Sequence, residues 1–154
     1  MRYSVILICL LVLAGCKSSQ VNTVPATEKK AFKGDWIVSS VNVDGRGQYR
    51  TTLLGSISGV CMQGSQWSLV SNNNRGSFEL TGADCAQGNN PIVWDYDATR
   101  NVLLIKPTDE RYKSETGTGY RFAVANLTEN SFELQQAVNT GNDAATLRIL
   151  FNRQ

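Results

Sequence analysis

The sequence predicts an all-β protein, an eight-stranded antiparallel up-and-down barrel that follows a signal peptide and a polar tether. From Phe32 onward, apolar and polar residues alternate with period two, and a helical period of 3.6 is almost absent. Clusters of Gly, Asn and Asp divide this alternation into eight short segments separated mainly by hairpin-length turns. A meander of eight strands closes into a barrel without exposed edges.

The composition excludes several classes of function. With 154 residues, 42% of them hydrophobic and 18% charged, the chain is long enough for one folded domain. A net charge of +2 does not indicate a nucleic-acid partner. The chain contains no histidine, which removes Ser-His-Asp and Cys-His catalysis and every His-ligated metal site. We therefore expect no enzyme, no metal and no cofactor.

The first 15 residues have the features of a signal peptide. Arg2 precedes an apolar run over residues 5–14, which is about half the length that a helix needs to span a membrane. The run ends in Leu13-Ala14-Gly15-Cys16, which resembles a bacterial lipobox. The resemblance implies cleavage before Cys16, diacylglycerol on its thiol and an acyl chain such as palmitate on its new amine. A plain secreted protein cleaved nearby is the alternative.

Residues 16–32 are predicted to form a lipidated flexible tether, because they are poor in apolar residues. The barrel would then occupy residues 33–154. Lys17 stands where an inner-membrane retention signal of bacterial lipoproteins would place Asp. By analogy with those lipoproteins, we expect a lipid anchor in the outer membrane of a bacterial cell envelope.

The eight predicted strands cover residues 35–43, 65–71, 76–81, 91–97, 102–107, 119–127, 131–138 and 145–152. Residues 45–64 are predicted to connect the first two strands as a short helix or a folded-over flap, and residues 108–118 as a solvated loop. The turns suggest three pairings: Ser71 with Gly76, Leu127 with Ser131, and Val138 with Ala145. The hairpin of residues 91–107 stays open, because either Val102 and Leu104 or Leu103 and Ile105 could face inward.

A Gly-x-Trp pattern, Gly34-Asp35-Trp36, opens the first predicted strand and resembles the start of calycins, lipocalins above all. The series that follows, with Cys61 to Trp67, Asn72 to Phe78, Cys85 and Trp94, resembles the lipocalin-like domain of small bacterial lipoproteins over residues 33–154. The resemblance implies an Arg of the last strand packed on Trp36, and Arg153 has the inward parity. The chain is shorter than a classical lipocalin and lacks its long C-terminal helix.

Two of the four cysteines remain in the barrel, since Cys9 leaves with the signal peptide and Cys16 is lipidated. Cys61 and Cys85 would then lie in a compartment that permits disulfides. Their bridge would close a loop of 24 residues and stabilise the fold by about 3.5 kcal/mol. Free thiols or a metal pair are the alternative, but a metal needs further ligands.

Nine aromatic residues fall on predicted inward positions: Trp36, Trp67, Phe78, Trp94, Tyr96, Tyr120, Phe122, Phe132 and Phe151. By resemblance to lipocalins they would line a cavity for a small hydrophobic ligand, with Trp67, Trp94, Tyr96, Phe122 and Gln136 as candidate contacts. The alternative is that the rings fill the barrel. The protein would then be a structural or interaction module that contacts another envelope protein through its loops.

Overall fold

The computed structural model describes residues 29–45, 49–114, 117, 119–139 and 144–154 of the chain. The predicted signal peptide, Cys16 and most of the tether lie outside these residues. No helix in the described ranges is long and apolar enough to cross a membrane.

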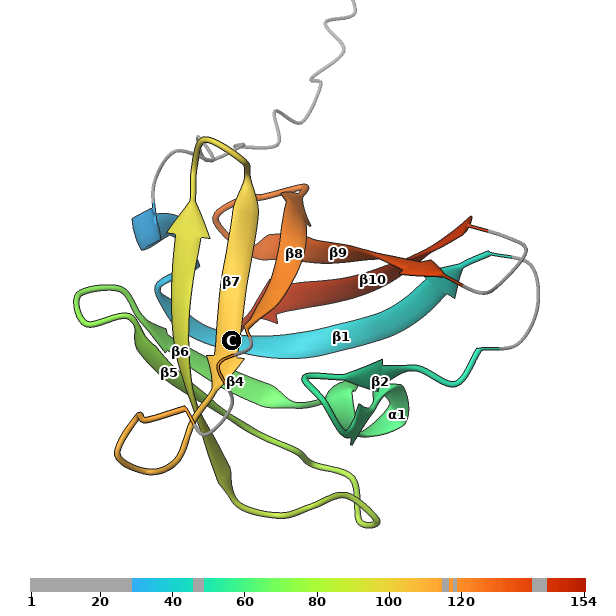
Figure 1. Ribbon diagram of the computed structural model, residues 1–154, viewed down its shortest axis with the longest axis horizontal. Coiled ribbons are helices and arrows are strands. Elements are labelled where there is room, and N and C mark those ends of the chain that lie inside the picture. Colours follow the sequence, from blue (N-terminus) through green and yellow to red (C-terminus); the bar gives the residue numbers. More distant parts are fainter. Residues whose placement is uncertain (1–28, 46–48, 115–116, 118, 140–143) are drawn as a thin grey trace, which may run out of the picture.

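Eight antiparallel strands form a closed barrel, as the sequence predicts (Figure 1). They are β1 (Gly34–Asp44), β4 (Gln66–Val70), β5 (Arg75–Glu79), β6 (Asn89–Asp97), β7 (Val102–Pro107), β8 (Tyr120–Ala125), β9 (Ser131–Asn139) and β10 (Ala144–Arg153). Each strand pairs with its neighbour in the chain, and β1 closes the barrel by pairing with both β4 and β10. The architecture is the up-and-down barrel of lipocalins.

Two of the three predicted registers are correct. Val124 pairs with Leu134 across β8 and β9, and Leu134 pairs with Ile149 across β9 and β10. The register of β4 and β5 is wrong by two residues, because Val70 rather than Ser71 closes the hairpin and pairs with Arg75. A shift of two residues leaves every side chain on its predicted face.

The open question of the 91–107 hairpin is resolved by the pairing of β6 with β7. Trp94 pairs with Ile105 and Tyr96 with Leu103. Leu103 and Ile105 are therefore the inward residues, and both are almost fully buried. Of the nine aromatic residues predicted to face inward, eight are buried and Tyr120 is half-buried.

The connection between β1 and β4 folds over one end of the barrel. It contains β2 (Thr52–Leu53), β3 (Ile57–Ser58) and the single-turn helix α1 (Gly59–Met62), and we call residues 49–62 the flap. The Gly59 amide donates to the Thr51 carbonyl over 2.9 Å. A side chain at Gly59 would collide with Thr51, so this close approach requires glycine. The prediction of a short helix or a flap is consistent with both features.

The opposite end of the barrel is closed by a segment predicted to belong to the tether. Residues Lys29–Phe32 form a 3-10 helix, η1, and the Phe32 side chain is fully buried. The packed domain therefore includes Lys29–Phe32, which precede the predicted start at residue 33. The boundary was misplaced because one aromatic residue in a polar segment produces no periodic pattern.

Candidate functional site

The end of the barrel beneath η1 is filled by aromatic rings. The Phe32 ring lies with its centroid 4.9 Å from that of Tyr96, 5.2 Å from that of Phe132 and 6.3 Å from that of Trp94. The Trp36 indole nitrogen donates a 2.9 Å hydrogen bond to the Phe32 carbonyl. Burial of these rings holds the N-terminal segment in place.

Arg153 covers Trp36 from outside. Its guanidinium carbon lies 4.2 Å from the centroid of the Trp36 ring, so the structure brings together the pair that the resemblance implied. The guanidinium also donates to the carbonyl oxygens of Glu129 at 2.7 Å and Lys33 at 3.1 Å. Gly34 has a φ of +130°, and a Cβ there would collide with the guanidinium, which explains a glycine two residues before the Trp.

Trp94 and Tyr96, predicted to wall an open ligand space, lie instead in this packed end. The Trp94 indole donates to the Arg75 carbonyl at 2.9 Å, and the Tyr96 hydroxyl donates to the Asn101 side chain at 2.8 Å. Burial, and then the negative charge of Asp97, raise the pKa of Tyr96 above its usual value, so the hydroxyl stays a donor. The structure differs from the prediction because the Phe32 ring packs against both of these rings.

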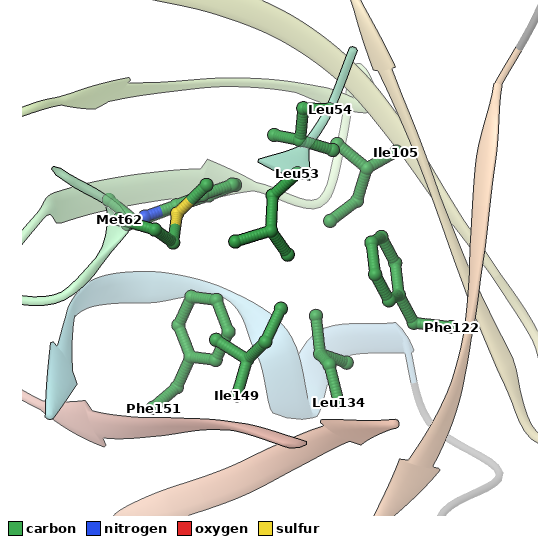
Figure 2. Close-up of a pocket in the computed structure, with 9 residues that line it drawn as sticks. Leu53, Leu54, Met62, Ile105, Phe122, Leu134, Ile149 and Phe151 are labelled. Carbon is green, nitrogen blue, oxygen red and sulfur yellow. The ribbon is translucent and has the colours of Figure 1, made fainter. Parts of the chain in front are cut away.

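Trp67 and Phe122, the other aromatic ligand candidates, lie nearer the flap. Trp67 stacks on Phe78 at 4.6 Å, and its indole donates to the buried Ser65 hydroxyl at 2.8 Å. Trp67 and Phe122 border a small apolar void under the flap (Figure 2), and the other lining residues are Leu53, Leu54, Met62, Ile105, Leu134, Ile149 and Phe151. The space open to the centre of a water molecule is about 10 Å³, which is room for one water at most.

Leu53 and Leu54 of the flap make this void small. Figure 2 shows Leu53 pointing into the void toward Ile149 and Leu134, and Leu54 lying beside Ile105. Leu53 is 2% exposed and Leu54 is 8% exposed. Leu54 has a φ of +46°, a conformation that side chains of this size rarely adopt. The flap thus inserts two of its own side chains where a deep ligand would lie.

A larger space lies beside the flap, and we call it the mouth groove. One wall is residues 49–52, and the other is Val43, Leu147 and the stretch Gln136 to Val138 at the ends of β1, β10 and β9. The volume open to the centre of a water molecule is about 270 Å³. Gln136, a predicted ligand contact, therefore lies in a cavity, although this cavity is at the rim of the barrel rather than at its centre.

The mouth groove continues the buried void along the same strands. Leu147 and Gln136 pair with each other and line the groove, while Ile149 and Leu134, two residues further along each strand, pair with each other and line the void. Alternate residues of a strand face the same side, so the four belong to one inner surface. Between the two spaces the flap passes from Thr52, in the groove, to Leu53, in the void.

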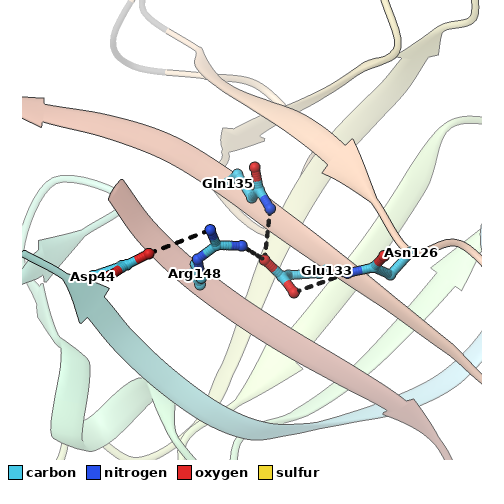
Figure 3. Close-up of polar contacts among 5 residues, drawn as sticks. All are labelled: Asp44, Asn126, Glu133, Gln135 and Arg148. Atoms are coloured by element: carbon cyan, nitrogen blue, oxygen red, sulfur yellow. Dashed lines mark hydrogen bonds and ion pairs between the residues drawn. The ribbon is translucent and has the colours of Figure 1, made fainter. Parts of the chain in front are cut away.

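A polar network lies on the outer face of the same strands (Figure 3). The Glu133 carboxylate accepts hydrogen bonds from Arg148 at 2.8 Å, from Gln135 at 2.7 Å and from Asn126 at 3.3 Å. Arg148 also bonds Asp44 at 3.4 Å. Burial by itself raises the pKa of Glu133, but these hydrogen bonds and the charge of Arg148 outweigh it, and the pKa lies below its ordinary value. The side chains of this network hydrogen-bond to one another, so the network ties together the strands that carry them.

Cys61 and Cys85 form a disulfide that fixes the flap to the β5–β6 loop. Cys61 lies in α1, outside the paired strands, so no strand register constrains it. Within the described ranges, no group of three or more His, Cys, Asp or Glu side chains is placed to hold a metal ion.

Sequence reasoning missed Phe32 and Arg50, the latter being the charged member of the mouth groove. Phe32 carried one usable signal, since it is the sole aromatic residue between the apolar N-terminal run and Trp36. Arg50 carried none, because its importance depends on how the flap folds.

Comparison with known proteins gives no match by sequence and one similar solved structure. The sequence matches no protein-family model and no curated protein. Among solved structures it is similar to a lipocalin-like protein from Bacteroides uniformis ATCC 8492, with 12% sequence identity and a TM-score of 0.48. The match covers 80% of this chain and 99% of that chain. The closed eight-stranded antiparallel barrel is the fold that the sequence predicted, and the Arg153–Trp36 contact is the one that the resemblance implied.

Proposed function

We propose that the protein binds a small molecule with an apolar part in the mouth groove of its barrel. The supporting observation is a cavity of about 270 Å³ between the flap and the inner surface of β1, β9 and β10. Ligand pockets combine apolar walls with a few polar groups and begin near 300 Å³. Val43, Val138 and Leu147 supply the apolar wall, and Gln136, Thr51 and Thr52 are among the polar residues of the lining.

The groove is a better candidate for the ligand site than the centre of the barrel. The central space of about 10 Å³ cannot hold an organic molecule while Leu53 and Leu54 stay in place. The groove needs no movement of the flap. A longer ligand would enter the barrel only by displacing these two leucines.

Titration with N-phenyl-1-naphthylamine, an uncharged probe that fluoresces in apolar surroundings, tests the proposal. Val43→Trp puts a large side chain into the groove, and we expect it to weaken binding of the probe at least tenfold. Val70→Trp is the matched control, since Val70 lies on β4 with 38% of its surface exposed. Wild-type protein that binds no probe, or equal loss in both variants, would contradict the groove as the site.

The packing of the barrel supports a second candidate. A filled interior is what a structural or interaction module of the envelope needs, because its loops would make the contacts. Absence of probe binding by the wild type, together with a high melting temperature, would favour this candidate.

The cellular location belongs to the same proposal. The lipobox-like Leu13-Ala14-Gly15-Cys16 supports a protein anchored by lipid at Cys16, and Lys17 supports the outer membrane of a bacterial envelope. Two or three acyl chains would make the anchoring stable. Cys16→Ser should leave the protein unprocessed or release it from membranes, and a variant that stays processed and membrane-bound would contradict the anchor.

A further inference from the structure

We infer that the ligand of the mouth groove is an anionic amphiphile with a single apolar chain, whose charged head is bound by Arg50. The inference rests on the proposed function, because it assigns a ligand class to the same groove. The supporting observations are one charge in the groove, no carboxylate paired with that charge among the described residues, and an apolar wall opposite it.

Arg50 carries the single charge among the described residues that line the groove. No carboxylate in the described part of the chain forms an ion pair with it. Asp44 follows the groove residue Val43, but Arg148 binds its carboxylate on the outer face of the barrel. A guanidinium has five donors in a planar fork that fits a carboxylate or a phosphate, so Arg50 can receive an anion there.

The rest of the groove separates a polar side from an apolar side. Arg50, Thr51 and Thr52 follow one another along the flap. Val43 and Leu147 pair with each other across β1 and β10 and form the opposite wall. A chain lying along that wall buries methylene groups, at about 0.8 kcal/mol each, while its head stays at the exposed rim beside Arg50.

Competition against bound N-phenyl-1-naphthylamine tests the charge of the ligand, whereas binding of the probe itself tests the groove as a site. We compare decanoate with decyltrimethylammonium at pH 7.5, since the two share an apolar chain of similar length and carry opposite charges. We expect decanoate to displace the probe at a lower concentration. The preference should fall about three- to fivefold in Arg50→Gln, the size expected of an exposed ion pair. It should also weaken as salt is raised.

Two further variants control for general effects of charge and folding. Arg121→Gln removes an exposed Arg of β8, away from the groove lining, and should keep the preference for decanoate. Arg50→Lys keeps the positive charge and should therefore keep most of the preference for decanoate. Decyl phosphate, tested beside decanoate, distinguishes a phosphate head from a carboxylate head.

The outcomes are distinct for the two proposals. If the probe binds but decanoate and decyltrimethylammonium compete equally, the anionic ligand is wrong and the groove remains a binding site. If Arg50→Gln and Arg121→Gln lose the preference equally, the role of Arg50 is wrong. If the probe does not bind the wild type, both the proposed function and this inference fail.

Discussion

The indole nitrogen of Trp36 donates a hydrogen bond to the carbonyl oxygen of Phe32, four residues earlier, at a distance of 2.9 Å. The bond fixes the backbone of η1, and the Phe32 ring enters the barrel beside Tyr96 and Phe132. Lys29, at the other end of η1, forms an ion pair with Asp95 at 2.6 Å. One end of the barrel is thus closed by residues that precede its first strand.

The first prediction concerns this closure. Phe32→Ala removes a fully buried ring, and we expect the free energy of unfolding to fall by about 3–5 kcal/mol in urea denaturation. A chain that begins at residue 33 should show a similar loss relative to one that begins at Lys29. Lys30→Ala, on the exposed side of η1, is the control. Equal stability of the two truncated chains would show that η1 does not belong to the domain.

The second prediction concerns Arg153. Arg153→Met keeps an unbranched apolar stem but removes the guanidinium, its contact with Trp36 and its bonds to the carbonyls of Glu129 and Lys33. We expect a loss of about 1–2 kcal/mol in thermal or urea unfolding. Arg153→Lys should recover little, because an ammonium does not reproduce the planar fork. Arg100→Met, which removes an exposed pair with Asp97, should cost much less.

The third prediction concerns the flap. Leu53→Ala enlarges the void under the flap, so we expect a loss of about 3 kcal/mol in stability and stronger binding of N-phenyl-1-naphthylamine. Leu104→Ala, at a half-buried outward position of β7, should cost less and leave probe binding unchanged. A Leu53 variant that loses stability without gaining affinity would show that the void does not connect with the groove.

The fourth prediction concerns the disulfide between Cys61 and Cys85, which closes a loop of 24 residues. Replacing both residues by serine should lower the free energy of unfolding by about 3.5 kcal/mol. Mass measurement after alkylation of the denatured protein, with and without prior reduction, should differ by two thiols. Two freely alkylated thiols without reduction would contradict the bridge.

The fifth prediction concerns pH. The pKa of Glu133 is lowered in the folded protein from an ordinary value of 4.5, so its ionised form stabilises the fold. That stabilisation is complete above the unfolded-state pKa and is lost as the pH falls through the folded-state pKa. Glu133→Gln should therefore be less stable than wild type at pH 7, and the difference should shrink on acidification below pH 4.5. A stability difference between Glu133→Gln and wild type that stays constant across this pH range would be evidence against this role.

Much of the barrel follows from local pattern. Alternation with period two assigns the face of each strand, and it identified the eight strands and the buried side of Trp67, Phe122 and Phe151. Short loops set the registers around Leu134, because few residues separate the paired strands. The β4–β5 turn was harder, since a run of three Asn residues fits more than one loop.

The state of the interior was decided by tertiary structure alone. Periodicity shows which side chains point inward, but the space left among them depends on segments that enter the barrel from elsewhere. Phe32 enters from the N-terminal side and Leu53 from the flap, and neither belongs to a barrel strand. Arg50 reaches the groove for the same reason, because the fold of the flap places it there. Cavity volume is a property of packing between distant parts of the chain, and no local pattern encodes it.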